Sequence, residues 1–195
     1  MNKKIVILIL ILVFVALLAG ASVLYAKLGQ SVAPEQLATK PSAAPTEPEE
    51  TAAEEEPVMA PDFTVYDLEG NPVTLYDFVG KPLVVNFWAS WCGLCQMEMP
   101  DFQEKFTVLG EDIQFLMINM TDGSRETTES ASAFIREQGY TFPVFYDTTT
   151  EAAMTYGAYS LPMTFFINAE GHAIARAVGA IDGDTLQKGI DLITE

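Results

Sequence analysis

The chain has 195 residues and a formal net charge of −17, with 27 acidic side chains against 10 basic ones. This acidic balance argues against binding to nucleic acid or to anionic lipid, because both attract clustered Lys and Arg side chains. The two cysteines and the single histidine cannot by themselves complete a four-ligand zinc site.

Residues 5–26 form an uncharged, apolar run that follows two lysines near the N-terminus. A helix of this length would measure about 33 Å, enough to cross a hydrocarbon core of roughly 30 Å. The lysines predict that the N-terminus stays in the cytoplasm and that the rest of the chain is exported. We therefore expect residues 1–26 to be a transmembrane signal anchor. A cleaved signal peptide is the alternative, with Ala19-Gly20-Ala21 supplying the small residues before the cut.

Residues 27–57 are rich in Ala, Pro, Thr and Glu. Such a composition buries too little apolar surface to offset the entropy lost on ordering. It predicts a disordered linker that tethers the domain formed by residues 58–195. A domain of that length has room for one ample core.

The domain opens with a predicted β-hairpin over residues 63–75, which alternate around Gly70-Asn71-Pro72. Residues 83–89 are apolar, β-branched and aromatic, which indicates a buried strand. A helix is predicted directly afterwards, from about Cys92 to Val108. Its apolar face recurs at steps of four and three: Cys95, Met99, Phe102, Phe106 and Leu109.

Strands and helices alternate through the remaining chain. Strands are predicted at 113–119, 142–146, 163–168 and 173–178, with helices ending near 138–139 and spanning 151–156 and 182–193. Asp182 is the expected N-cap of the last helix. This pattern predicts a layered α/β domain.

The two cysteines stand two residues apart, after a predicted strand and at the start of a predicted helix. Free N–H groups and the helix dipole favour an anion there, and the thiolate is the reactive form of cysteine. Cys92 is therefore the expected attacking thiol, and Cys95 the thiol that resolves the mixed disulfide. Half a zinc site and a purely structural disulfide are the alternatives.

Several motifs of the domain resemble one family. They are Ala60-Pro61-Asp62-Phe63, Asn86-Phe87-Trp88-Ala89-Ser90-Trp91-Cys92, Glu98 with Pro100, and Leu161-Pro162-Met163-Thr164-Phe165-Phe166-Ile167. Together they resemble the TlpA/ResA type of membrane-anchored thiol–disulfide oxidoreductase. The resemblance implies an α/β thioredoxin-like fold with an N-terminal β-hairpin and a central helical insertion. It leaves the redox potential open, because Gly93-Leu94 replaces the Gly-Pro of thioredoxin.

The resemblance also implies a role for Glu98 in tuning the dithiol. Asn86 occupies the strand position where thioredoxin has a buried aspartate, which leaves the proton-handling role vacant, and the family has a glutamate three residues after the second cysteine. On a helical wheel Glu98 lies at the border of the apolar stripe. A solvated helix charge is the alternative.

Three further residues are expected to bind substrate. The resemblance implies a cis peptide bond between Leu161 and Pro162 that leaves a backbone edge free beside the dithiol. Without the resemblance, a trans proline at a strand start would be the expectation. Trp91 is expected to cover the dithiol and contact substrate, with simple packing as the alternative.

These inferences predict an enzyme that exchanges electrons with protein dithiols and disulfides through Cys92 and Cys95. The resemblance implies envelope substrates such as apocytochrome c, an extracytoplasmic redox domain, and a membrane electron donor of the CcdA/DsbD type. No cofactor and no metal are expected. A copper-binding or metal-delivery module on the same fold, and a peroxiredoxin-like peroxidase, are the alternatives.

Overall fold

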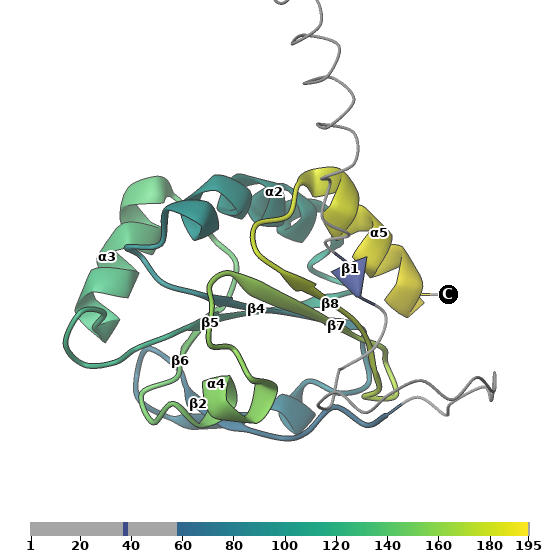
Figure 1. The fold of residues 1–195 in the computed structure, drawn as a ribbon, viewed down its shortest axis with the longest axis horizontal. Helices are drawn as coiled ribbons and strands as arrows, with labels where there is room; N and C mark the ends of the chain where they lie inside the picture. Colours follow the sequence, from purple (N-terminus) through teal and green to yellow (C-terminus); the bar gives the residue numbers. More distant parts are fainter. Residues whose placement is uncertain (1–36, 39–57, 195) are drawn as a thin grey trace, which may run out of the picture. The chain divides into compact units, whose positions relative to one another are not determined.

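β4 (Leu83–Trp88) runs through the middle of a mixed sheet and leads directly into the segment that carries both cysteines (Figure 1). The computed structural model describes residues 37–38 and 58–194. The expected signal anchor and nearly all of the expected linker lie outside these residues. Within them, no helix combines the length and the apolar character needed to cross a membrane.

The sheet has the strand order β1-β8-β7-β4-β5-β6-β2-β3. The remaining strands are β1 (Leu37–Ala38), β2 (Thr64–Tyr66), β3 (Pro72–Thr74), β5 (Gln114–Asn119), β6 (Val144–Tyr146), β7 (Met163–Ile167) and β8 (Ala173–Val178). β2 and β3 pair antiparallel with Val65 opposite Val73, which confirms the predicted hairpin. A 3-10 turn, η1 (Leu75–Asp77), follows it.

Helices cover both faces of the sheet. They are α2 (Gly93–Leu109), α3 (Thr128–Gln138), α4 (Glu151–Tyr156) and α5 (Gly183–Thr194). α2, α3 and α5 lie over one face, and α4 lies on the other (Figure 1). α3 occupies the place of the expected central insertion, between β5 and β6. The layered α/β architecture therefore agrees with the predicted fold class.

Each face of the sheet has its own hydrophobic core, because successive strand residues point to opposite sides. Val84 packs on the α2 side with Met99, whereas Val85 packs on the α4 side with Tyr156. All six residues of β4 are buried. β4 pairs in parallel with β5 and antiparallel with β7. The last residues of β4 and β5 and the first residues of β7 therefore lie at the same end of the sheet.

α5 packs closely on β7 through a glycine. A Cβ atom placed on Gly189 would overlap the buried ring of Phe166, so this position requires a residue without a side chain. The helix begins at Gly183, where Oδ1 of Asp182 accepts a 2.8 Å hydrogen bond from the N–H of Thr185. This bond confirms Asp182 as the cap predicted from the sequence.

Candidate active site

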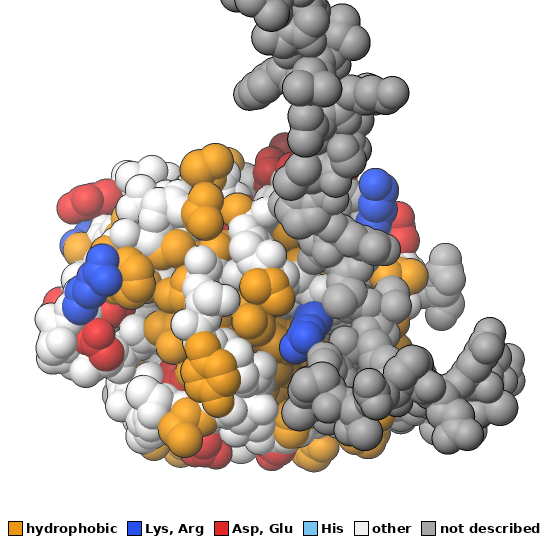
Figure 2. Space-filling model, viewed as in Figure 1, with side chains coloured by type: hydrophobic (Ala, Val, Ile, Leu, Met, Phe, Trp, Pro, Cys, Tyr) orange, Lys and Arg blue, Asp and Glu red, His pale blue; other side chains and the backbone are white. Residues whose placement is uncertain are grey.

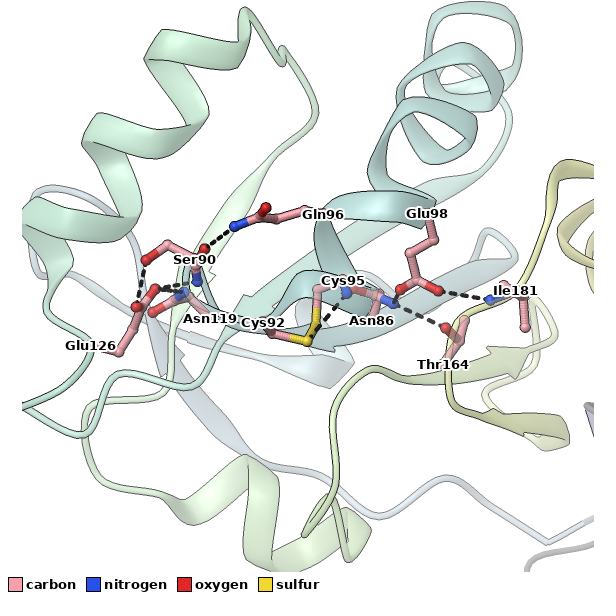
Figure 3. The surroundings of a disulfide bond; sticks show 10 residues. All are labelled: Asn86, Ser90, Cys92, Cys95, Gln96, Glu98, Asn119, Glu126, Thr164 and Ile181. Carbon is pink, nitrogen blue, oxygen red and sulfur yellow. Dashed lines mark hydrogen bonds between the residues drawn. A yellow bond between two sulfur atoms is a disulfide. The ribbon is translucent and has the colours of Figure 1, made fainter.

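The two cysteines form a disulfide at the first turn of α2 (Figure 3). Cys92 is the N-cap residue, and its Sγ accepts a 3.2 Å hydrogen bond from the N–H of Cys95. The Cα atoms lie 5.2 Å apart, within the range that a disulfide requires. Cys92 keeps 6% of its surface exposed and Cys95 none, so solvent and substrate reach Cys92 first.

Glu98 lies one turn beyond Cys95 on the same helix and is buried, with 2% of its surface exposed. Its Oε1 accepts a 2.8 Å hydrogen bond from Nδ2 of Asn86, and its Oε2 accepts a 3.0 Å bond from the N–H of Ile181. Burial raises the pKa of Glu98 to about 7, although both hydrogen bonds lower it; the nearby charge of Asp101 adds a small increase. The solvated-charge alternative is therefore wrong.

A carboxyl group with a pKa near neutrality can give up or accept a proton at physiological pH. Asn86 holds this carboxyl from the neighbouring strand and also donates a 3.0 Å hydrogen bond to Oγ1 of Thr164. Its Oδ1 is buried without a partner among the described residues. An acceptor is therefore available close to the Glu98 carboxyl.

The Leu161–Pro162 peptide bond is cis, as the resemblance implied. Pro162 precedes β7, which pairs with β4 so that Met163 lies opposite Phe87. This pairing places the cis-proline at the end of the sheet where β4 leads into the segment with both cysteines. The carbonyl of Pro162 accepts a 2.9 Å bond from the N–H of Gly179. Within residues 58–194, no hydrogen bond engages the backbone N–H or C=O of Leu161.

Trp91 is 42% exposed and immediately precedes Cys92. The guanidinium carbon of Arg125 lies 3.5 Å from the centroid of its ring, a cation–π contact. Trp91 is thus held on one side by the loop between β5 and α3. Its expected contact with substrate remains a prediction.

Glu126 is a buried residue of this neighbourhood that the sequence analysis does not identify. Its surface is fully buried, and its carboxylate accepts bonds from the N–H of Ser90 (2.8 Å), from Oγ of Ser90 (2.7 Å) and from Nδ2 of Asn119 (2.7 Å). Ser90 in turn accepts a 2.6 Å bond from Nε2 of Gln96 at its carbonyl (Figure 3). Ser90, in the turn that carries Cys92, is therefore hydrogen-bonded both to the loop after β5 and to α2.

The described residues contain no cluster of side chains suited to metal binding. Among the described residues, no three His, Cys, Asp or Glu side chains stand close enough together to hold an ion. His172 lies across the sheet end from Met59 in an isolated bridge, and its backbone N–H bonds Oδ1 of Asn168.

The geometry of the dithiol agrees with what comparison with known proteins shows. The family model described as AhpC/TSA family matches residues 58–176. The chain belongs to the AhpC/TSA family. A thiol–disulfide oxidoreductase ResA of Bacillus thuringiensis is 33% identical over 136 residues, covering 69% of this chain and 76% of the relative.

Solved structures agree with this assignment. An exposed lipoprotein thioredoxin of Streptococcus pneumoniae is 31% identical with a TM-score of 0.57, covering 68% of this chain and 100% of that one. A thiol:disulfide interchange protein of the thioredoxin family from Chlorobium tepidum has a TM-score of 0.62 at 24% identity, covering 72% of this chain and 99% of that one. The protein is a thiol–disulfide oxidoreductase with a thioredoxin-like fold, as predicted.

Proposed function

We propose that this protein reduces disulfides on the outer side of the cytoplasmic membrane, and that the buried carboxyl of Glu98 favours electron flow from the dithiol to the substrate. The observation that carries the proposal is the burial of Glu98 one turn from Cys95, with a pKa of about 7. A carboxylate in that position disfavours a neighbouring thiolate. A dithiol whose reduced form is poorly stabilised gives up its electrons readily, the opposite of a strongly oxidising protein with a stabilised thiolate.

The reaction follows from the different exposure of the two cysteines. The thiolate of Cys92 attacks one sulfur of the substrate disulfide, forms a mixed disulfide and expels the other substrate sulfur as a thiolate. The thiolate of Cys95 then attacks Sγ of Cys92, closes the Cys92–Cys95 disulfide and expels the second substrate thiolate. Two electrons pass to the substrate, and the two protons of the enzyme's thiols end on the substrate's thiols.

Glu98 acts in the second step as the group that takes the proton of Cys95. It lies three residues after Cys95 on α2, and side chains with this spacing share a helix face. The hydrogen bonds from Asn86 and Ile181 hold the carboxyl in place while it changes protonation state.

Trp91, Leu161 and Pro162 form the substrate-binding edge in this proposal. Leu161 has backbone groups without partners among residues 58–194, and it stands beside the cis-proline at the start of β7. An extended substrate segment can pair with such an edge. Trp91 supplies a partly exposed aromatic surface next to the attacking thiol.

We further propose that residues 1–26 anchor the protein in the membrane and that a CcdA/DsbD-type protein supplies its electrons. The uncharged run of residues 5–26 supports the anchor. An exported dithiol becomes oxidised unless electrons are supplied, which supports the donor. The exposed lipoprotein described for the Streptococcus pneumoniae neighbour agrees with an extracytoplasmic site. Apocytochrome c is the substrate that the TlpA/ResA resemblance favours.

One experiment tests the direction of electron flow. The protein is equilibrated with defined ratios of reduced and oxidised glutathione, and the fraction of closed Cys92–Cys95 disulfide is measured by mass spectrometry after acid quenching. We expect a reduction potential more negative than about −200 mV, and reduction of a peptide with a Cys-x-x-Cys-His disulfide. A potential near that of a strong oxidant, about −120 mV, would contradict the reductase assignment.

A separate experiment tests the location. We expect the full-length protein to stay in the membrane fraction after a carbonate wash, with residues 58–195 digested by protease added outside. A mature protein whose N-terminal sequence begins at Ser22 would show instead that the segment is cleaved.

A further inference from the structure

Two consecutive residues of the loop between β5 and α3 contact two consecutive residues of the active-site turn. Arg125 lies over the ring of Trp91, and the buried Glu126 binds both the N–H and the hydroxyl of Ser90. The backbone position of Arg125, whose side chain contacts the residue before the attacking cysteine, is therefore fixed by the buried Glu126.

The backbone of this loop is fixed on its other side as well. Oδ1 of Asp122 accepts hydrogen bonds from the N–H groups of Ser124 (2.7 Å), Arg125 (2.7 Å) and Glu126 (3.0 Å). These bonds hold the pKa of Asp122 below its ordinary value, with the bond from Glu126 as the largest cause. Asp122 and Glu126 thus fix the backbone of the loop around Arg125.

The guanidinium of Arg125 is exposed, and its charge has no partner within residues 58–194. None of the hydrogen bonds or ion pairs in that range uses its side-chain nitrogens. Its guanidinium carbon lies over the indole ring, 3.5 Å from the ring centroid, and this contact uses none of the N–H donors of the guanidinium. A guanidinium with free N–H groups can donate two parallel hydrogen bonds to a carboxylate.

The surroundings make this cation unusual. The sequence of residues 58–195 contains only 6 basic residues beside 20 acidic ones. On the face shown in Figure 2, Lys and Arg side chains are scattered and form no basic patch. A positive charge on Trp91, the residue before Cys92, is therefore a local feature of an acidic domain.

We propose that Arg125 is a specificity-determining residue that binds an acidic side chain adjacent to the reacting cysteine of the substrate polypeptide. The inference rests on the disulfide exchange at Cys92 described above and adds a substrate class to it. Trp91 contacts the guanidinium, and the loop between β5 and α3 supplies a positive charge in a domain with few of them.

The test uses three disulfide-linked peptide dimers that differ only in the residue after cysteine: Glu, Gln or Lys. The reduced full-length protein is mixed with each dimer, and the second-order rate constant is followed by mass spectrometry. We expect the wild type to react about three to five times faster with the Glu dimer than with the Lys dimer, the range of an exposed charge pair. This ratio should decrease as salt is added.

Arg125→Gln should bring the Glu-to-Lys ratio to 1 or below, and Arg125→Lys should give an intermediate ratio because it keeps the charge without the flat guanidinium. Arg136→Gln is the matched control, because it removes the same charge from an exposed arginine in the last turn of α3. It should keep the wild-type ratio. A loss of stability alone would change all three rates together and leave their ratio unchanged.

Any of three results would overturn the proposal. They are a wild-type ratio of 1 or less, a wild-type ratio that Arg125→Gln retains, and an equal loss of preference in Arg125→Gln and Arg136→Gln. Reduction of 2-hydroxyethyl disulfide, which is uncharged, separates these results from a failure of the oxidoreductase function. A wild type inactive toward both that compound and every peptide would refute the function itself, and the specificity role with it.

Discussion

The backbone N–H of Ile181 donates a 3.0 Å hydrogen bond to Oε2 of Glu98, although the two residues are 83 positions apart. This bond joins the loop before α5 to the helix that carries both cysteines. It also places a backbone dipole on the carboxyl, opposing the effect of burial on its pKa. The protonation of Glu98 is thus coupled to the position of the last helix as well as to the dithiol.

Replacing Cys95 by serine should trap the substrate on Cys92. The thiol of Cys92 retains some exposure whereas that of Cys95 has none, and without Cys95 the mixed disulfide cannot be resolved. We expect Cys95→Ser to accumulate a covalent adduct with a peptide disulfide, visible on a non-reducing gel and by mass spectrometry. Cys92→Ser is the matched variant and should form at least tenfold less adduct. Comparable trapping by both variants would contradict the assigned roles.

Replacing Glu98 by glutamine should lower the apparent pKa of the reduced dithiol and slow disulfide exchange. The amide keeps the size of the side chain but removes the charge and the titration near pH 7. Thiol alkylation measured against pH reports the change. Glu104→Gln, an exposed glutamate on the same helix, should give the wild-type profile. If the Glu98→Gln profile superimposes on that of the wild type, Glu98 has no part in the chemistry.

The stability of the oxidised protein should also depend on Glu98, with a definite sign. Because the pKa of Glu98 is about 7 in the folded state and its ordinary value is 4.5, the folded state binds one more proton than the unfolded state between these pH values. Protonation of Glu98 thus adds to the free energy of unfolding. This contribution is complete below pH 4.5 and is lost as the pH rises through 7. As the pH rises from 4.5 to 8, the free energy of unfolding of Glu98→Gln should increase by about 3 kcal/mol relative to that of the wild type.

Urea unfolding of both oxidised proteins at several pH values measures this gain, and the disulfide removes thiol titration from the comparison. Other carboxylates act equally in both proteins and cancel in the difference. A difference in the free energy of unfolding that stays constant with pH would show that Glu98 titrates normally.

Gly189→Ala should destabilise the fold without touching the dithiol. The new methyl group would overlap the ring of Phe166, and such overpacking costs about 1–3 kcal/mol, more than the helix propensity gained from alanine, about 1 kcal/mol. Gly183→Ala on the same helix is the control, since its Cβ would meet Asp101 only at an ordinary contact distance of 3.4 Å. Thermal melts should show a lower Tm for Gly189→Ala alone.

The sequence predicted the elements well wherever periodicity determined them. The strand at 173–178 and the short helix at 151–156 have the predicted bounds, because apolar spacing and turn residues define them locally. The burial of Glu98 was underestimated: the helical wheel placed it at a border, and the loop at Ile181 that covers it belongs to a distant segment.

Glu126 could not be found from its neighbours in the chain. It stands in a polar stretch where a glutamate is normally solvated. Its partners are Ser90 and Asn119, which follow or end two strands that become adjacent only when β4 and β5 pair in parallel with Trp88 opposite Asn119. Burial of this kind depends on the sheet register, which a single sequence does not specify for residues beyond the strand end.

The parallel pairing of β4 with β5 brings the reactive dithiol next to a loop that lies about 30 residues further along the chain. β4 and α2 carry the thiols and Glu98, whereas the segment after β5 carries Arg125 and its anchors. Under the proposed role of Arg125, exchanging this residue between related enzymes while keeping Glu126 would redirect the protein to new clients and leave the dithiol and Glu98 unchanged. The fold allows the range of partners to evolve independently of the driving force for electron transfer.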